Sequence, residues 1–108
     1  MLPPQYTNVA IDWHLYDCFS GHKSAQEHID DAKAWGPMIA EHNKYHPIFV
    51  GEWSLATGDD RATQEYADAQ TTSFQQGIGW YFWSLKLEDS KDNDAWSFQS
   101  AIKNGYKI

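Results

Sequence analysis

Three apolar runs, alternating with helical patterns, constrain the fold of this chain more than any other feature of its sequence. The runs are NVAIDWHLY at 8–16, PIFVGEW at 47–53 and GIGWYFWSL at 77–85. The second and third are almost continuously apolar, which is typical of strands in a parallel sheet that is covered on both faces. A helical pattern follows each run, so we predict the element order βαβαβα.

The predicted helices have local signals at their ends and in their interiors. Helical periodicity covers three segments: 24–44, 60–76 and 94–104. Ser24 and Glu27 have the spacing of a capping box at the start of the first helix. The Gly36-Pro37 pair inside that helix predicts a kink or a division. Asp94 is the predicted cap of the last helix.

The spacing of the strands indicates the fold class. Strand starts about 30 to 40 residues apart are typical of the βα units of a TIM barrel, in which about 250 residues make eight units. A doubly wound sheet has similar units, but no G-x-G-x-x-G follows the first run to indicate a nucleotide site. About three units do not close a barrel, and they leave both outer strands as open edges. We therefore predict an α/β fold, a partial TIM (β/α)8 barrel with parallel strands and helices outside, as one domain over 1–108.

Charge and aromatic content narrow the classes of partner. The chain has 8 Lys and Arg against 15 Asp and Glu, which gives a net charge of −7. This balance argues against nucleic acid, because phosphate recognition needs a basic stripe, and it disfavours an anionic membrane surface. A neutral ligand such as a carbohydrate fits the charge. Because 16% of the residues are aromatic, more than a small core uses, we expect some rings at a binding site.

The sequence leaves two alternatives for the cellular compartment of the protein. The single cysteine, Cys18, has no partner for an internal disulfide and no metal framework around it. The first residues, MLPPQYTNV, do not resemble a signal peptide, and no apolar run is long enough to span a bilayer. Taken literally, the sequence predicts a cytosolic protein. The alternative is a piece of a longer protein that has lost its leader.

Polar and aromatic residues stand at the carboxyl ends of all three predicted strands. His14 and Tyr16 end the first strand, Glu52 ends the second, and Trp83 and Lys86 end the third. In a parallel βα array these ends share one face, where barrels build their active sites. Each residue alone has a structural explanation, since a strand-end Glu is usually solvated or paired and a strand Trp usually lies in the core. Their coincidence at corresponding strand ends predicts one site.

Three motifs in this chain resemble the last three strands of glycoside hydrolase family 5 (the cellulase-like family), and most closely its fungal-type exo-1,3-β-glucanase branch. That branch carries D-x-H-x-Y, G-E-W-S and G-W-x-F-W-x-x-K, which stand here at 12–16, 51–54 and 79–86. The tail DNDAWSFQ also resembles the family's W-D-F-Q ending, with Ser97 where Asp is usual. The resemblance covers nearly the whole chain and implies strands six to eight, the C-terminal part of a catalytic domain.

The resemblance implies a role for each motif residue. Glu52 matches the family's catalytic nucleophile, and His14 and Tyr16 match residues that hydrogen-bond around it. Trp83 matches the aromatic platform under the sugar that is cut. Further substrate contacts are expected from the same motifs: Trp53, Trp80 and Lys86. The implied activity is cleavage of β-glucan with retention of configuration and without a cofactor, by a parent enzyme that is extracellular or in the cell wall.

The acid/base half of a two-carboxylate site is missing from these motifs. In the family the acid/base is a Glu that follows Asn at the end of strand four, and no Asn-Glu pair occurs here. The remaining carboxylates read as solvated side chains of helices and of the loop 88–94, although Glu88 is a candidate to reach the sugar. Loss of the acid removes a factor of roughly 10² to 10⁴ from the rate. We therefore expect no useful turnover from this chain without the missing N-terminal barrel segment.

Two other functional readings stay open at this point. The chain is either a non-catalytic carbohydrate-binding remnant that uses Trp83, Trp53 and Trp80 as platforms, or a truncated gene product with no folded function. Open strand edges make the second reading credible.

Metal binding is not predicted. His42 and His46 are four residues apart, as in some zinc sites, but no third ligand is evident and the helix must end before Pro47. The loop EDSKDND at 88–94 lacks the ligand positions and the turn glycine of a calcium loop.

Overall fold

A computed structural model describes residues 7–58, 62–89 and 93–108 of the chain. The elements in these residues are β1 (Ile11–His14), α1 (Ala25–Asn43), β2 (Ile48–Trp53), α2 (Gln64–Phe74), β3 (Trp80–Phe82) and α3 (Phe98–Lys103). The predicted βαβαβα order is confirmed. Each strand is shorter than the apolar run that predicts it, and β2 fills its run most completely.

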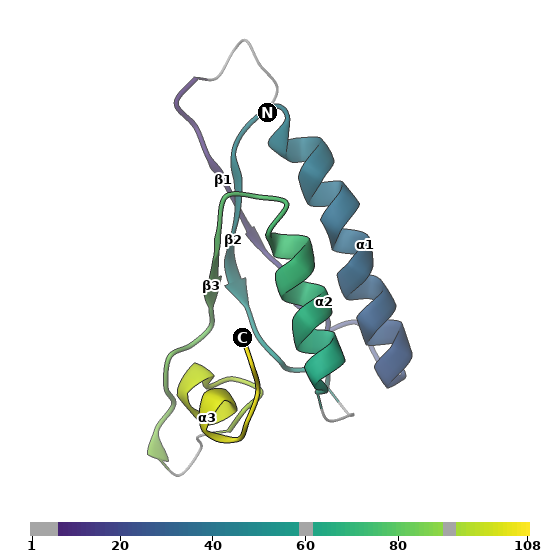
Figure 1. The fold of residues 1–108 in the computed structure, drawn as a ribbon, viewed down its shortest axis with the longest axis vertical. Coiled ribbons are helices and arrows are strands. Elements are labelled where there is room, and N and C mark those ends of the chain that lie inside the picture. The colour runs from purple at the N-terminus through teal and green to yellow at the C-terminus, as the bar shows by residue number, and fades with distance from the viewer. Residues whose placement is uncertain (1–6, 59–61, 90–92) are drawn as a thin grey trace.

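The strands form one parallel sheet in the order β1-β2-β3, with β2 in the centre. Figure 1 shows α1 and α2 side by side along the strands, while α3 lies at the end of the molecule toward which the strands point. This arrangement is α/β with an open sheet, so β1 and β3 each pair with one strand among the described residues. It has the form of consecutive βα units of a barrel, although the numbering of the strands as six to eight stays a prediction.

The core lies between the sheet and the two long helices. Its centre is formed by Val50 and Trp53 of β2, Ile39 of α1 and Phe74 of α2, all of them buried. The Trp53 ring meets the Phe74 ring edge-on, with 5.3 Å between the centroids. Together these contacts fix which face of the sheet is covered.

Of the kink or division predicted at Gly36-Pro37, the division is wrong, and a kink stays a prediction. Helix α1 runs unbroken from Ala25 to Asn43 with Pro37 inside it. At this level α1 packs closely on α2, since a Cβ on Gly36 would come within 3.1 Å of Ser73 Oγ. The Ser73 hydroxyl also donates a 2.6 Å hydrogen bond to the Ala32 carbonyl. This tertiary packing offsets the hydrogen bond that a helical proline removes.

Asp94 does not cap the last helix. Helix α3 begins after Ser97, whose hydroxyl accepts a hydrogen bond from the Ser100 amide at 3.1 Å. The residues before it are held at the strand ends, because the Ala95 carbonyl accepts from Leu55 and the Trp96 carbonyl accepts from Ser84. These bonds keep 94–96 in a turn.

None of the helices in the described part of the chain is long and apolar enough to cross a membrane.

Candidate active site

A break in the alternation of β2 turns Glu52 toward the uncovered side of the sheet. Val50 and Trp53 both lie in the core although they are three residues apart, with the half-buried Gly51 and Glu52 between them. The pairing register of β2 with both neighbours shifts within this stretch, so that His14 of β1 stands opposite Glu52. Such a bulge re-aims a side chain, and it sets Glu52 apart from its apolar neighbours.

Position 51, directly before Glu52, requires glycine for a steric reason. A Cβ at position 51 would overlap the Asp12 carboxylate, which lies directly over Gly51. Only glycine leaves room for this close approach of a neighbouring side chain. Gly51 therefore leaves space for the Asp12 carboxylate, and the bulge at the same place exposes Glu52.

Three of the residues predicted from the motifs meet in one cluster. The Tyr16 hydroxyl donates a 2.8 Å hydrogen bond to Glu52 Oε2. His14 Nδ1 lies 3.4 Å from the same oxygen, while His14 Nε2 lies 3.1 Å from Asp12 Oδ2. An imidazole between two carboxylates donates to both only when both ring nitrogens carry protons. The carboxylate at position 52, whose side chain is 27% exposed, thus faces the Tyr16 donor and the His14 imidazole and is open to solvent.

Tyr16 stays a donor over the physiological pH range. Burial, and then the hydrogen bond to Glu52 and its charge, raise the pKa of the Tyr16 phenol above its ordinary value. Its ring packs against the ring of Trp96, with 5.6 Å between the centroids. The hydroxyl is therefore a neutral donor beside the carboxylate.

Trp83 is placed at the same end of the sheet with an exposed ring. Its amide donates to the Trp53 carbonyl at 2.8 Å, one residue beyond Glu52, and its peptide bond to Ser84 is cis. The residue is 53% exposed. Lys86 follows on the surface and forms a 3.0 Å ion pair with Asp89.

The prediction that Trp53 contacts substrate is wrong. Trp53 is 0% exposed and lies in the core, so that no face of its ring is open to a ligand. Trp80 is half-buried and packs edge-on against Trp53, with 5.2 Å between the centroids. A substrate contact of Trp80 stays a prediction.

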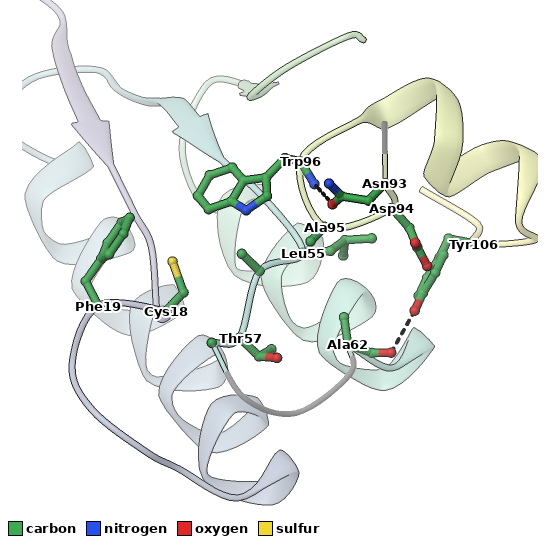
Figure 2. A pocket seen from close by; sticks show the side chains of 12 residues that line it. Cys18, Phe19, Leu55, Thr57, Ala62, Asn93, Asp94, Ala95, Trp96 and Tyr106 are labelled. Atoms are coloured by element: carbon green, nitrogen blue, oxygen red, sulfur yellow. Dashed lines mark hydrogen bonds between the residues drawn. The ribbon is translucent and has the colours of Figure 1, made fainter. Parts of the chain in front are cut away.

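A hollow of about 520 Å³ lies next to this cluster, at the carboxyl ends of the strands. Figure 2 shows that it is lined by the segments that follow all three strands, with Cys18 and Phe19 on one side, Leu55 at the base, and Trp96 above. Tyr106 completes the lining and donates a 2.7 Å hydrogen bond to the Ala62 carbonyl. The hollow therefore joins loops that are far apart in the sequence.

Phe19 and Trp96 lie beside the cluster although the three motifs do not predict them as site residues. Both rings contact Tyr16, and the Phe19 ring is 5.8 Å from it between centroids. Trp96 stands in the tail motif, which is the signal that points to it. Phe19 follows the first strand in a segment without helical or strand periodicity, so no pattern singles it out.

No group of three or more potential metal ligands occurs in the part of the chain that the structure describes. His42 instead packs edge-on against Trp13, with 5.0 Å between the ring centroids. The loop EDSKDND falls partly on residues 90–92, outside the described residues.

The fold and the cluster define a class: parallel βα units that gather a carboxylate, an imidazole and a phenol at their carboxyl ends. Sequence comparison agrees with the resemblance found in the motifs, since the chain is similar to curated glucan 1,3-beta-glucosidases. The glucan 1,3-beta-glucosidase of Schwanniomyces occidentalis is 28% identical over an alignment that takes in 94% of this chain and 33% of the relative. For glucan 1,3-beta-glucosidase 2 of Wickerhamomyces anomalus the identity is 26%, over 89% of this chain and 33% of the relative.

A shorter match gives higher identity. The probable glucan 1,3-beta-glucosidase D of Aspergillus niger is 40% identical over 43 residues, which are 40% of this chain and 5% of the relative. No family model matches the chain. The chain thus spans about a third of the length of the first two relatives.

Proposed function

We propose that this chain is the nucleophile-bearing C-terminal part of a retaining glycoside hydrolase catalytic domain that cleaves β-1,3-glucan. The observation that carries the proposal is the contact of the Tyr16 hydroxyl and the His14 imidazole with one carboxylate oxygen of Glu52, at the carboxyl ends of parallel strands. The names of the similar proteins support the substrate class.

Glu52 acts as the nucleophile in this proposal. Its carboxylate oxygen forms a bond to the anomeric carbon of the glucosyl unit, while the bond from that carbon to the leaving oxygen breaks and the leaving oxygen takes a proton from a second carboxyl group. Water then gives a proton to the second carboxylate and attacks the anomeric carbon, the bond from that carbon to Glu52 breaks, and the sugar leaves with its original configuration. Tyr16 and His14 hold the reacting oxygen in place by hydrogen bonds.

Trp83 binds the sugar in the same proposal. Its exposed indole offers an apolar face to the C–H side of a pyranose and leaves the sugar hydroxyls to polar neighbours. Lys86, which is exposed beyond Trp83, is a second contact.

The second carboxyl group comes from a partner segment. The uncovered face of the sheet carries Asp12, Phe49 and Tyr81, and the outer edges of β1 and β3 lie open among the described residues. We propose that further βα units, the N-terminal part of the barrel, pair with these edges and bring the acid/base. On this proposal the strands are six to eight of a TIM barrel, and the parent enzyme is extracellular or in the cell wall.

A non-catalytic carbohydrate-binding role is the second candidate. The exposed ring of Trp83 favours it, because a stacking platform binds sugar whether or not an acid is present.

A chimeric enzyme tests the proposed function. Residues 1–108 replace the matching third of the Schwanniomyces occidentalis relative, which then supplies the remaining βα units. We expect the chimera to hydrolyse laminarin, because the two carboxyl groups are reunited, whereas the 108-residue chain alone and the relative without its matching third give no useful turnover. The measurement is the release of reducing sugar. A folded chimera that binds laminari-oligosaccharides without cleaving them favours the binding role, and a chain without a cooperative melt favours a truncated product.

A further inference from the structure

A buried ionic cluster begins at the residue after Tyr16, in the segment between β1 and α1. Its centre is Asp17, whose side chain is 7% exposed and lies in the segment between β1 and α1. His28 of α1, with a side chain that is 1% exposed, places Nδ1 2.7 Å from Asp17 Oδ2. Lys23 donates to Asp17 Oδ1 at 3.1 Å and to Asp31 Oδ2 at 2.6 Å. A buried carboxylate is costly without partners, and this one has a partner on each oxygen.

The cluster ties the segment after β1 to helix α1. The Leu15 amide donates to the Glu52 carbonyl at 3.0 Å, which anchors the beginning of this segment to β2. Two residues later Asp17 is fixed to α1 through His28. Tyr16 lies between these anchors, and because consecutive Cα atoms are about 3.8 Å apart its backbone has little freedom.

The aromatic contacts of Tyr16 do not supply the same restraint. Phe19 is 77% exposed, and Trp96 is half-buried on the loop before α3. A phenol that leans on an exposed ring can slide along it, whereas a buried carboxylate with two charge-assisted bonds is fixed in direction. Asp17 is therefore the stronger restraint on where the Tyr16 hydroxyl lies.

We propose that Asp17, clamped by His28 and Lys23, is a positioning residue that holds the Tyr16 hydroxyl on Glu52. The proposal deepens the proposed function, on which its catalytic meaning rests, since Tyr16 is the donor that orients the nucleophile. The geometric part, namely that the cluster determines the Tyr16–Glu52 hydrogen bond, is independent of any activity.

The tautomer of His28 makes the test specific. A carboxylate only accepts, so Nδ1 carries the proton that binds Asp17. His28 Nε2 is buried and has no hydrogen-bond partner among the described residues. The side-chain amide nitrogen of asparagine falls near the position of Nδ1, and that of glutamine falls near Nε2. His28→Asn therefore keeps the donor to Asp17, while His28→Gln fills more of the space but moves the donor away.

The experiment follows the ¹³Cζ resonance of Tyr16 in the 108-residue chain labelled at its tyrosines, assigned by its loss in Tyr16→Phe. The change in this resonance caused by Glu52→Gln is the signature of the hydrogen bond, and it is measured by adding Glu52→Gln to each variant. We expect this signature to fall at least twofold in Asp17→Asn and in His28→Gln, and to persist in His28→Asn and in the exposed control Glu41→Gln. An undiminished signature in Asp17→Asn, or equal behaviour of the two His28 variants, overturns the proposal.

Lys23→Gln is a third variant, which is expected to destabilise the fold less than the variants at Asp17 and His28. The Lys23 side chain is 23% exposed and lies at the rim of the cluster. We expect an intermediate loss of the signature, and an unchanged signature contradicts the clamp. The readout involves no turnover. An inactive chimera with an intact pattern of signatures therefore refutes the proposed function alone, whereas an active chimera with an unaltered signature refutes the positioning role alone.

Discussion

The Glu52→Gln variant of the chimera is expected to lose a factor of roughly 10⁴ or more in kcat/KM on laminari-oligosaccharides, the scale at which loss of a nucleophile is measured in other hydrolases. The amide keeps the size of the carboxylate but cannot form the glycosyl-enzyme. We expect KM to change little, because the ring of Trp83 and the remaining sugar contacts are intact. The measurement is steady-state kinetics on laminari-oligosaccharides of fixed length.

A matched substitution controls for the loss of a negative charge. Glu41 forms an exposed 2.8 Å ion pair with Lys44 on α1. Glu41→Gln is expected to leave kcat/KM unchanged, since exposed pairs of this kind contribute little. Survival of most of the activity in Glu52→Gln eliminates Glu52 as the nucleophile.

The second large effect separates two tryptophans, Trp53 at the end of β2 and Trp83 directly after β3. Trp53→Ala is expected to lower the free energy of unfolding of the 108-residue chain by about 3 to 5 kcal/mol, because the ring is fully buried and leaves a cavity beside Phe74. Trp83→Ala is expected to change it by about 0.5 kcal/mol or less, because most of its ring contacts solvent. Urea unfolding followed by circular dichroism measures both values.

The binding of sugar should follow the opposite order. Calorimetry with laminari-oligosaccharides is expected to show the loss of binding in Trp83→Ala, since stacking on its face is removed. An unfolding midpoint that is equally lowered in both variants contradicts the assignment of Trp53 to the core and Trp83 to the surface. Unchanged binding in a folded Trp83→Ala chain contradicts the platform.

Much of the fold could be predicted because its signals are local. Runs such as PIFVGEW identify buried parallel strands, and their alternation with helical patterns gives the element order that the structure has. The meeting of His14, Tyr16 and Glu52 could also be predicted, since parallel strands bring their carboxyl ends to one face.

The face of the sheet on which Trp53 lies could not be predicted from the periodicity of β2. Strict alternation from Val50 places Glu52 on the helix side and Trp53 on the open side, and the bulge at this point exchanges them. At the bulge the Asp12 carboxylate lies over Gly51, which is a contact between strands. A pattern within one strand does not contain it.

Other differences arise from tertiary contacts. Helix α1 continues through Pro37 because its small residues pack on α2, and the last helix begins after Ser97 because strand ends hold the turn before it. Phe19 of the same segment and Trp96 of another loop lie beside Tyr16 through ring contacts, which no periodic pattern in the sequence predicts. Local propensity is a weak guide where such contacts decide.

Covalent trapping of the chimera tests the central claim most directly. A 2-deoxy-2-fluoro-β-glucoside with a dinitrophenyl leaving group needs no acid for the first step, and its fluorine slows the release of the sugar from the nucleophile. We predict that mass mapping finds one fluoroglucosyl group, on the carboxylate of Glu52, and none in Glu52→Gln. A fluoroglucosyl group on another carboxylate, with Glu52 unmodified, would contradict the account.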